Sequence, residues 1–112
     1  MRYAIPVSGG MVSPHFGHCE HFALIDVDEQ TKKILKKDLV PSPAHQPGLL
    51  PQWLAEQGVA FVIAGGMGSR AQSLFQQNRI EVIIGVVEGD PEKAVLSHLN
   101  GMLTTGDNIC DH

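Results

Sequence analysis

Cysteine, basic residues and long apolar runs are scarce in this 112-residue sequence, and each scarcity excludes a class of protein. The two cysteines, Cys19 and Cys110, are too few for the disulfide framework of a small secreted domain, so thiols or metal ligands are expected. No apolar run approaches the roughly 20 residues of a membrane span, and the first residues lack the apolar stretch of a signal peptide. We therefore expect a cytoplasmic protein without a role in membranes.

Lysine and arginine together number 8, against 12 aspartates and glutamates, which gives a formal net charge of −4. A protein that binds duplex nucleic acid normally presents a basic face, so a nucleic-acid partner is not expected. Catalytic motifs are missing as well: the sequence has no P-loop lysine and no G-x-S-x-G elbow. A two-metal nuclease on such a sheet needs several carboxylates on its central strands, and residues 3–7, the expected first strand, carry none. We expect a protein that is not an enzyme.

The composition, 43% hydrophobic and 18% charged, is typical of a globular protein. The length fits one domain over residues 1–112, with a flexible tail from about residue 102. Apolar residues alternate with others in three early segments, and two later segments are nearly all apolar. These five segments are predicted to be strands, at residues 2–8, 20–28, 31–40, 59–64 and 80–87.

Helical spacing of apolar residues predicts three helices in the second half of the chain. The first helix ends at Gly58, and the second follows the glycine turn at 65–68. The third begins at the Asp90-Pro91 cap and ends at Asn100-Gly101. The order is β-β-β-α-β-α-β-α, an α/β fold with one mixed five-stranded sheet and the first strand in its centre.

Ligands of such sheets bind beyond the carboxyl ends of the parallel strands. In this chain those ends are Ser8-Gly9-Gly10, Gly65 to Gly68, and Val87-Glu88-Gly89. A functional site is expected at this edge.

Histidines gather directly after the first strand. The segment His15-Phe16-Gly17-His18-Cys19-Glu20-His21 holds three imidazoles and one thiol, which are the usual ligands of soft and borderline metals. If the second strand has begun, Cys19 and His21 share one face. The tail adds Cys110 and His112, one sulfur and one nitrogen ligand. The alternative is that these are ordinary loop and strand residues and that the tail is frayed.

The turn Gly65-Gly66-Met67-Gly68-Ser69-Arg70 lies between a strand and a helix. Such a turn presents backbone N–H groups to an anion, and Arg70 adds a charged donor. Gly66-x-Gly68-x-x-Ala71, with Glu88 22 residues after Gly66, also fits a loose dinucleotide fingerprint. Two alternatives stay open: a nucleotide- or phosphate-binding regulatory module, and glycines that serve the turn alone.

Several segments together resemble the dinitrogenase iron–molybdenum cofactor biosynthesis family. They are Ala4 to Ser8, His15 to Cys19, Gly58-Val59, Ala64 to Gly68 and Asp107 to Cys110. The resemblance implies an RNase H-like three-layer fold without nuclease activity. It also implies a carrier of a metal–sulfur cluster, either the molybdenum–copper sulfide cluster of orange-protein-like members or an iron–molybdenum–sulfur precursor. Partner proteins would belong to a cluster-assembly or cell-division-associated complex.

The resemblance also implies a site for a large, soft, anionic cluster, held mainly without covalent bonds. Its cofactor-binding residues would be Ser8, His15, Phe16, His18, Gly66, Met67, Gly68 and Arg70. Candidate metal ligands are His15, His18, Cys19, Cys110 and His112. Where many family members have a glycine- and histidine-rich stretch, this chain has the proline-rich segment 41–48.

Overall fold

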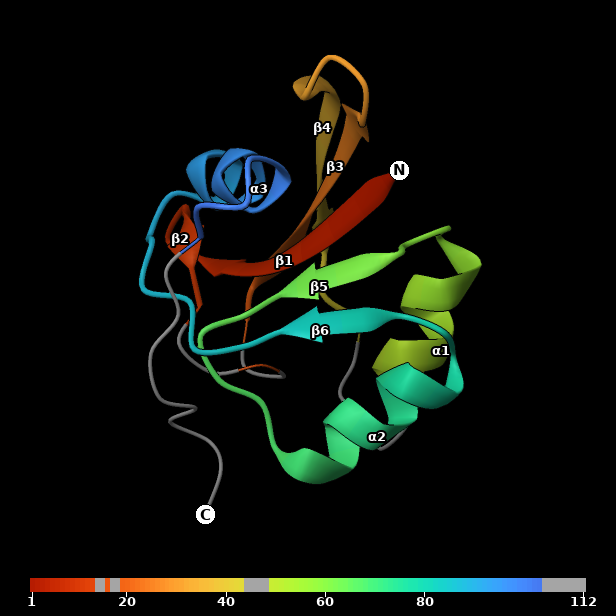
Figure 1. The fold of residues 1–112 in the computed structure, drawn as a ribbon. Coiled ribbons are helices and arrows are strands. Elements are labelled where there is room, and N and C mark those ends of the chain that lie inside the picture. The colour runs from red at the N-terminus through yellow and green to blue at the C-terminus, as the bar shows by residue number, and fades with distance from the viewer. Residues whose placement is uncertain (14–15, 17–18, 44–48, 104–112) are drawn as a thin grey trace.

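The computed structural model describes residues 1–13, 16, 19–43 and 49–103 (Figure 1). It is a mixed α/β structure with a mixed sheet, so the predicted fold class is confirmed. The elements in chain order are β1 (Arg2–Ser8), β2 (Met11–Val12), β3 (His21–Asp28), β4 (Lys33–Pro41), α1 (Leu49–Glu56), β5 (Phe61–Ile63), α2 (Ser69–Gln77), β6 (Glu81–Ile83) and α3 (Pro91–Leu99).

Strand β1 lies in the middle of the sheet, as predicted. The strand order is β4-β3-β1-β5-β6. β1 pairs antiparallel with β3 on one side and parallel with β5 on the other, and β5 pairs parallel with β6. The carboxyl ends of β1, β5 and β6 therefore open on the same edge of the sheet.

The predicted count of five strands is wrong, because the sheet contains a sixth strand, β2. Its two residues pair with the end of β1, Met11 opposite Ser8 and Val12 opposite Val7. Gly9 and Gly10 form the turn with φ of +60° and +80°, the conformation that a tight hairpin turn requires. Two residues are too few to show alternation, so only the glycine pair could have signalled this hairpin.

Strands β5 and β6 are shorter than the apolar runs that predicted them. The residues beyond their ends still hydrogen-bond across the same two segments: the Ala64 N–H donates to the Ile83 carbonyl, and the Gly85 N–H to the Gly65 carbonyl. The segments thus stay adjacent as far as the glycine turn, although they leave regular strand geometry.

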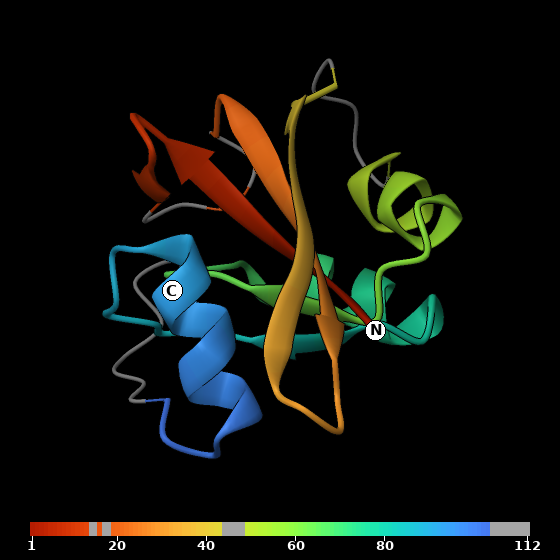
Figure 2. The same ribbon diagram turned by 90° about the horizontal axis from the view of Figure 1, so that it is seen from above.

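Helices cover both faces of the sheet, α1 and α2 on one face and α3 on the other (Figures 1 and 2). Each face has its own buried core. Phe22 and Leu24 of β3 point to the side of α1 and α2, whereas Ala23, Ile25 and Val27 point to the side of α3. This division confirms the alternation read from the sequence.

The predicted helix boundaries in the second half are confirmed by capping geometry. The Asp90 carboxylate accepts hydrogen bonds from the N–H groups of Glu92 and Lys93, and Pro91 is the first residue of α3. Gly58 and Gly101 follow α1 and α3 with φ of +78° and +68°. Beyond α3, Leu103 packs against the core, so the chain is still attached to the domain past residue 102. Residues 104–112 lie outside the described residues.

No helix in the part of the chain that the structure describes is both long enough and apolar enough to cross a bilayer.

An ion pair joins the start of β1 to β3. Arg2 Nε lies 2.7 Å from Asp26 Oδ1, and this hydrogen bond lowers the pKa of the Asp26 carboxyl below its ordinary value. A depressed folded-state pKa gives stability that is present at neutral pH and is lost as the pH falls through that pKa. The contribution is modest because both side chains are about one-third exposed.

Asp26→Asn should therefore lower the free energy of unfolding by about 1 kcal/mol at pH 7. Urea denaturation of both proteins at pH 7, and again at successively lower pH, checks this. The difference should shrink as wild-type Asp26 becomes protonated, and a difference that stays constant down to acid pH would contradict the assignment.

Candidate functional site

The carboxyl ends of β1, β5 and β6 are joined by backbone hydrogen bonds into one continuous edge. The Phe16 N–H donates to the Gly66 carbonyl at 3.0 Å, which attaches the segment after β2 to the glycine turn after β5. The Val12 N–H donates to the Gly89 carbonyl at 2.8 Å, which attaches β2 to the segment after β6. Segments distant in the sequence thus meet where the topology predicted a site.

Helix α2 begins at this edge with its first N–H groups uncapped by any side chain. Its N-cap is Gly68, with φ −65° and ψ 152°, and no side-chain hydrogen bond caps the helix. Helix α3 differs, since Asp90 occupies the same positions there. An uncapped N-terminus carries partial positive charge and donors aimed outward, so this end of α2 is suited to an anion.

Arg70 adds a full positive charge to this end of α2. It is the second residue of the helix and is exposed. None of the described carboxylates forms an ion pair with it. A guanidinium beside free helix N–H groups can bind an anion through charge-assisted hydrogen bonds.

Met67, one of the predicted cofactor-binding residues, is buried in the described structure. The side chain is 1% exposed and belongs to the core beneath α1 and α2. Its carbonyl accepts a hydrogen bond from Gln72 Nε2, which ties the turn to the first turns of α2. The long apolar side chain packs in the core, so Met67 supports the turn from the side of the core. Gly66 is also buried, while Gly68 is half-buried.

Phe16 anchors the histidine-containing segment to the domain. Its ring lies 5.3 Å from that of Phe75 in an edge-to-face arrangement and 5.8 Å from that of Phe22. Together with the N–H bond to Gly66, these contacts hold this residue against both α2 and the turn. Phe16 is half-buried, and its predicted contact with a ligand stays a prediction.

Ser8, the last residue of β1, contacts a residue that the sequence analysis missed. Its hydroxyl accepts a hydrogen bond from the Glu20 N–H at 3.3 Å, and the Glu20 carboxylate accepts one from the Gly9 N–H at 2.8 Å. The Glu20 carboxylate therefore binds a backbone N–H of the turn after β1. No sequence motif signalled this contact, because it depends on the register of β1 against β3.

The candidate metal ligands are only partly within the described residues. His15, His18, Cys110 and His112 lie outside them. Cys19 is half-buried and packs against the core below α1 and α2, whereas His21 is exposed at the first residue of β3. Cys19 precedes the strand, so the condition for sharing a face with His21 is not met. Among residues 1–13, 16, 19–43 and 49–103, no three His, Cys, Asp or Glu side chains converge on a metal-sized space.

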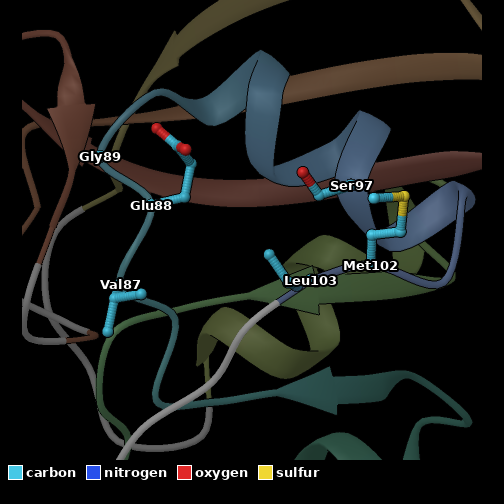
Figure 3. Close-up of a pocket in the computed structure, with 6 residues that line it drawn as sticks. All are labelled: Val87, Glu88, Gly89, Ser97, Met102 and Leu103. Atoms are coloured by element: carbon cyan, nitrogen blue, oxygen red, sulfur yellow. The ribbon is translucent and has the colours of Figure 1, made fainter.

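A cavity of about 260 Å³ lies on the α3 side of the same edge (Figure 3). Its lining comes from the segment after β6 and from the end of α3 and beyond: Val87, Glu88, Gly89, Ser97, Met102 and Leu103. Glu88 points toward α3 in Figure 3, and its Oε1 accepts a hydrogen bond from the Asp90 N–H. Glu88, the acidic residue of the loose dinucleotide fingerprint, thus lies on the face of the sheet opposite α2. Its carboxylate already accepts a hydrogen bond from the backbone two residues further along the chain.

Comparisons with known proteins agree with this architecture. Residues 1–101 match the model of the family described as dinitrogenase iron-molybdenum cofactor. The uncharacterized protein MJ0580 of Methanocaldococcus jannaschii is 32% identical over 87 residues, which are 73% of this chain and 72% of that protein.

Two solved structures extend the likeness to nearly the whole chain. The crystal structure of PH0822 has a TM-score of 0.85 at 29% identity and covers 94% of each chain. The apo form of the orange protein from Desulfovibrio gigas has a TM-score of 0.73 at 25% identity, covering 96% of this chain and 93% of that one. Because the family model matches almost the full length of this chain, the chain belongs to the dinitrogenase iron-molybdenum cofactor family.

Proposed function

We propose that this protein binds and carries an anionic metal–sulfur cluster, held mainly by non-covalent contacts at the edge where the 65–68 turn meets Phe16. The observation that carries the proposal is the uncapped N-terminus of α2 with Arg70 beside it. A binding role, rather than a catalytic one, accords with the lack of a recognisable catalytic motif in the sequence.

The chemistry of this edge suits a cluster of thiomolybdate type. Such a cluster is a large, polarizable anion whose sulfur atoms accept hydrogen bonds from backbone N–H groups and from a guanidinium. The net charge of −4 would repel it elsewhere, so a local cationic site is needed. His15 and His18 lie outside the described residues but are close to Phe16 in the sequence, and we propose that their imidazoles complete the site.

Family membership supports the cargo class. The family description names an iron–molybdenum cofactor, and the solved relatives include an orange protein. We propose a molybdenum–copper sulfide cluster as the first choice and an iron–molybdenum–sulfur precursor as the second. We further propose that the sheet with helices on both faces is of RNase H-like type, and that the cluster passes to proteins of an assembly or cell-division-associated complex.

Reconstitution tests the proposal. The purified chain is incubated with tetrathiomolybdate and Cu(I), freed of excess reagent on a desalting column, and analysed for molybdenum and copper per chain and for visible absorbance. We expect retained metal near a fixed stoichiometry with charge-transfer bands. A chain that stays colourless and metal-free, while binding ATP or inorganic phosphate tightly in calorimetry, would contradict the proposal and favour a nucleotide- or phosphate-binding module.

A further inference from the structure

The cavity on the α3 side of the sheet is not used by the proposed cluster site. It has a volume of about 260 Å³ and lies between the segment after β6 and the chain that leaves α3 (Figure 3). Helix α2, whose N-terminus belongs to the proposed cluster site, covers the opposite face of the sheet (Figures 1 and 2). The cavity therefore calls for an explanation of its own.

Exposed apolar side chains gather around this cavity. Six large apolar side chains are exposed in the part of the chain that the structure describes, and two of them, Val87 and Met102, line the cavity at 70% and 76% exposure. A third, Met11, is 54% exposed, and its methyl group lies directly against Gly89, which also lines the cavity. Exposed apolar side chains that gather in one place are typical of a surface that another protein covers.

Glu88 adds a negative charge to this apolar surface. The side chain is half-buried, and its Oε1 accepts a hydrogen bond from the Asp90 N–H at 3.0 Å, which holds the carboxylate beside the cavity. That bond leaves Oε2 available. No lysine or arginine of the described residues forms an ion pair with Glu88. A half-buried carboxylate without a cation of its own is suited to a charge-assisted hydrogen bond from a cation outside the chain.

The volume limits what can enter the cavity. Pockets that hold drug-sized ligands enclose about 300–1,000 Å³, so about 260 Å³ is suited to a smaller group, such as one long side chain. An arginine side chain matches the lining, because its methylene groups can pack against the apolar residues while its guanidinium donates to Glu88. The Ser97 hydroxyl, which also lines the cavity, can accept a further N–H.

We propose that this cavity receives an arginine side chain of a partner protein, and that apolar residues beside that arginine pack on Met11, Val87 and Met102. The net charge of −4 supports a partner with a basic docking segment, because complementary charge favours association and excludes acidic surfaces. Arginine and methionine are both enriched in protein interfaces, whereas lysine is depleted. This docking goes beyond cluster binding, and either can fail without the other, since the two sites lie on opposite faces of the sheet.

Titration with a short peptide tests the proposal. The probe is acetyl-Leu-Arg-Leu-amide, and its neutral counterpart carries citrulline, which has nearly the shape of arginine without the charge. Backbone amide chemical shifts of the ¹⁵N-labelled chain are followed up to about 5 mM of each peptide. We expect saturable changes at residues 87–89 and 102–103 with the arginine peptide, and binding at least about tenfold weaker with the citrulline peptide.

Glu88→Gln removes the charge and keeps an oxygen for the Asp90 N–H, so the turn should stay folded while the affinity for the arginine peptide falls about tenfold. Glu56→Gln is the matched control, because Glu56 is exposed in α1 on the opposite face of the sheet, and it should bind like the wild type.

Three results with the peptides would overturn the proposal: no change at residues 87–89 at about 5 mM, equal binding of the citrulline peptide, or unchanged affinity of Glu88→Gln. Propylguanidine, which is the arginine side chain alone, provides a further arm. It should bind more weakly than the peptide, because it leaves the exposed apolar side chains uncovered. Equal affinity of the two would also overturn the proposal, since the cavity would then be a site for a free small cation.

Discussion

Replacing Arg70 with alanine is expected to weaken the binding of tetrathiomolybdate with copper about 10- to 150-fold. The range corresponds to the roughly 1.5–3 kcal/mol of a hydrogen bond to a charged group. Arg70 is exposed before the ligand binds, so solvent competes for its guanidinium and the lower part of the range is expected. Titration followed by visible absorbance gives the two dissociation constants.

Lys93→Ala is the matched control for this substitution. Lys93 is an exposed cation in the first turn of α3, where Asp90 already occupies the helix N–H groups. Its removal should change the affinity less than about twofold. Cys19→Ser should also matter less than Arg70→Ala if the cluster is held without a covalent sulfur ligand. Equal losses for Arg70→Ala and Lys93→Ala would mean that only the overall charge matters.

Phe75→Ala should cost about 3–5 kcal/mol of unfolding free energy, as expected for the truncation of a fully buried aromatic side chain. Phe75 is fully buried, and its ring is the contact between α2, the core below it and Phe16. The loss is a large fraction of the 5–15 kcal/mol that holds a domain of this size together. Since α2 carries Arg70 and the uncapped N–H groups, any folded fraction of the variant should also bind the cluster less tightly.

Gln76→Ala provides the comparison for that loss. Gln76 is the next residue of α2 and is exposed, so its substitution should change the unfolding free energy by less than about 0.5 kcal/mol. Urea denaturation at pH 7 measures both variants. A loss below about 1 kcal/mol for Phe75→Ala would contradict the role given to this ring.

Sequence patterns predicted those parts of the fold that local rules decide. Strand β1 was predicted with its observed bounds, and the alternation in β3 assigned Phe22 and Ile25 to the correct faces. The cap at Asp90 was readable because proline follows it directly. In each case the signal is a short-range preference of backbone or side chain that the tertiary structure does not override.

Features set by tertiary contacts were missed or misread. Strand β2 exists because Gly9 and Gly10 fold Met11 back onto Ser8, and two residues carry no periodicity. Met67 lies within the glycine turn, and its burial in the core below α1 and α2 could not be read from the turn motif alone. The contact of Glu20 with the Gly9 N–H depends on the register between strands, which no single segment encodes.

Backbone amide chemical shifts of the ¹⁵N-labelled chain, followed during titration with tetrathiomolybdate and Cu(I), test the proposed site most directly. The N–H groups of residues 68–71 should show the largest changes, because they form the uncapped N-terminus of α2 beside Arg70. Those of Glu92 and Lys93 should not move, since Asp90 already binds them. Changes concentrated instead around the cavity at Val87 and Met102, or spread evenly over the surface, would contradict a cluster site at this edge.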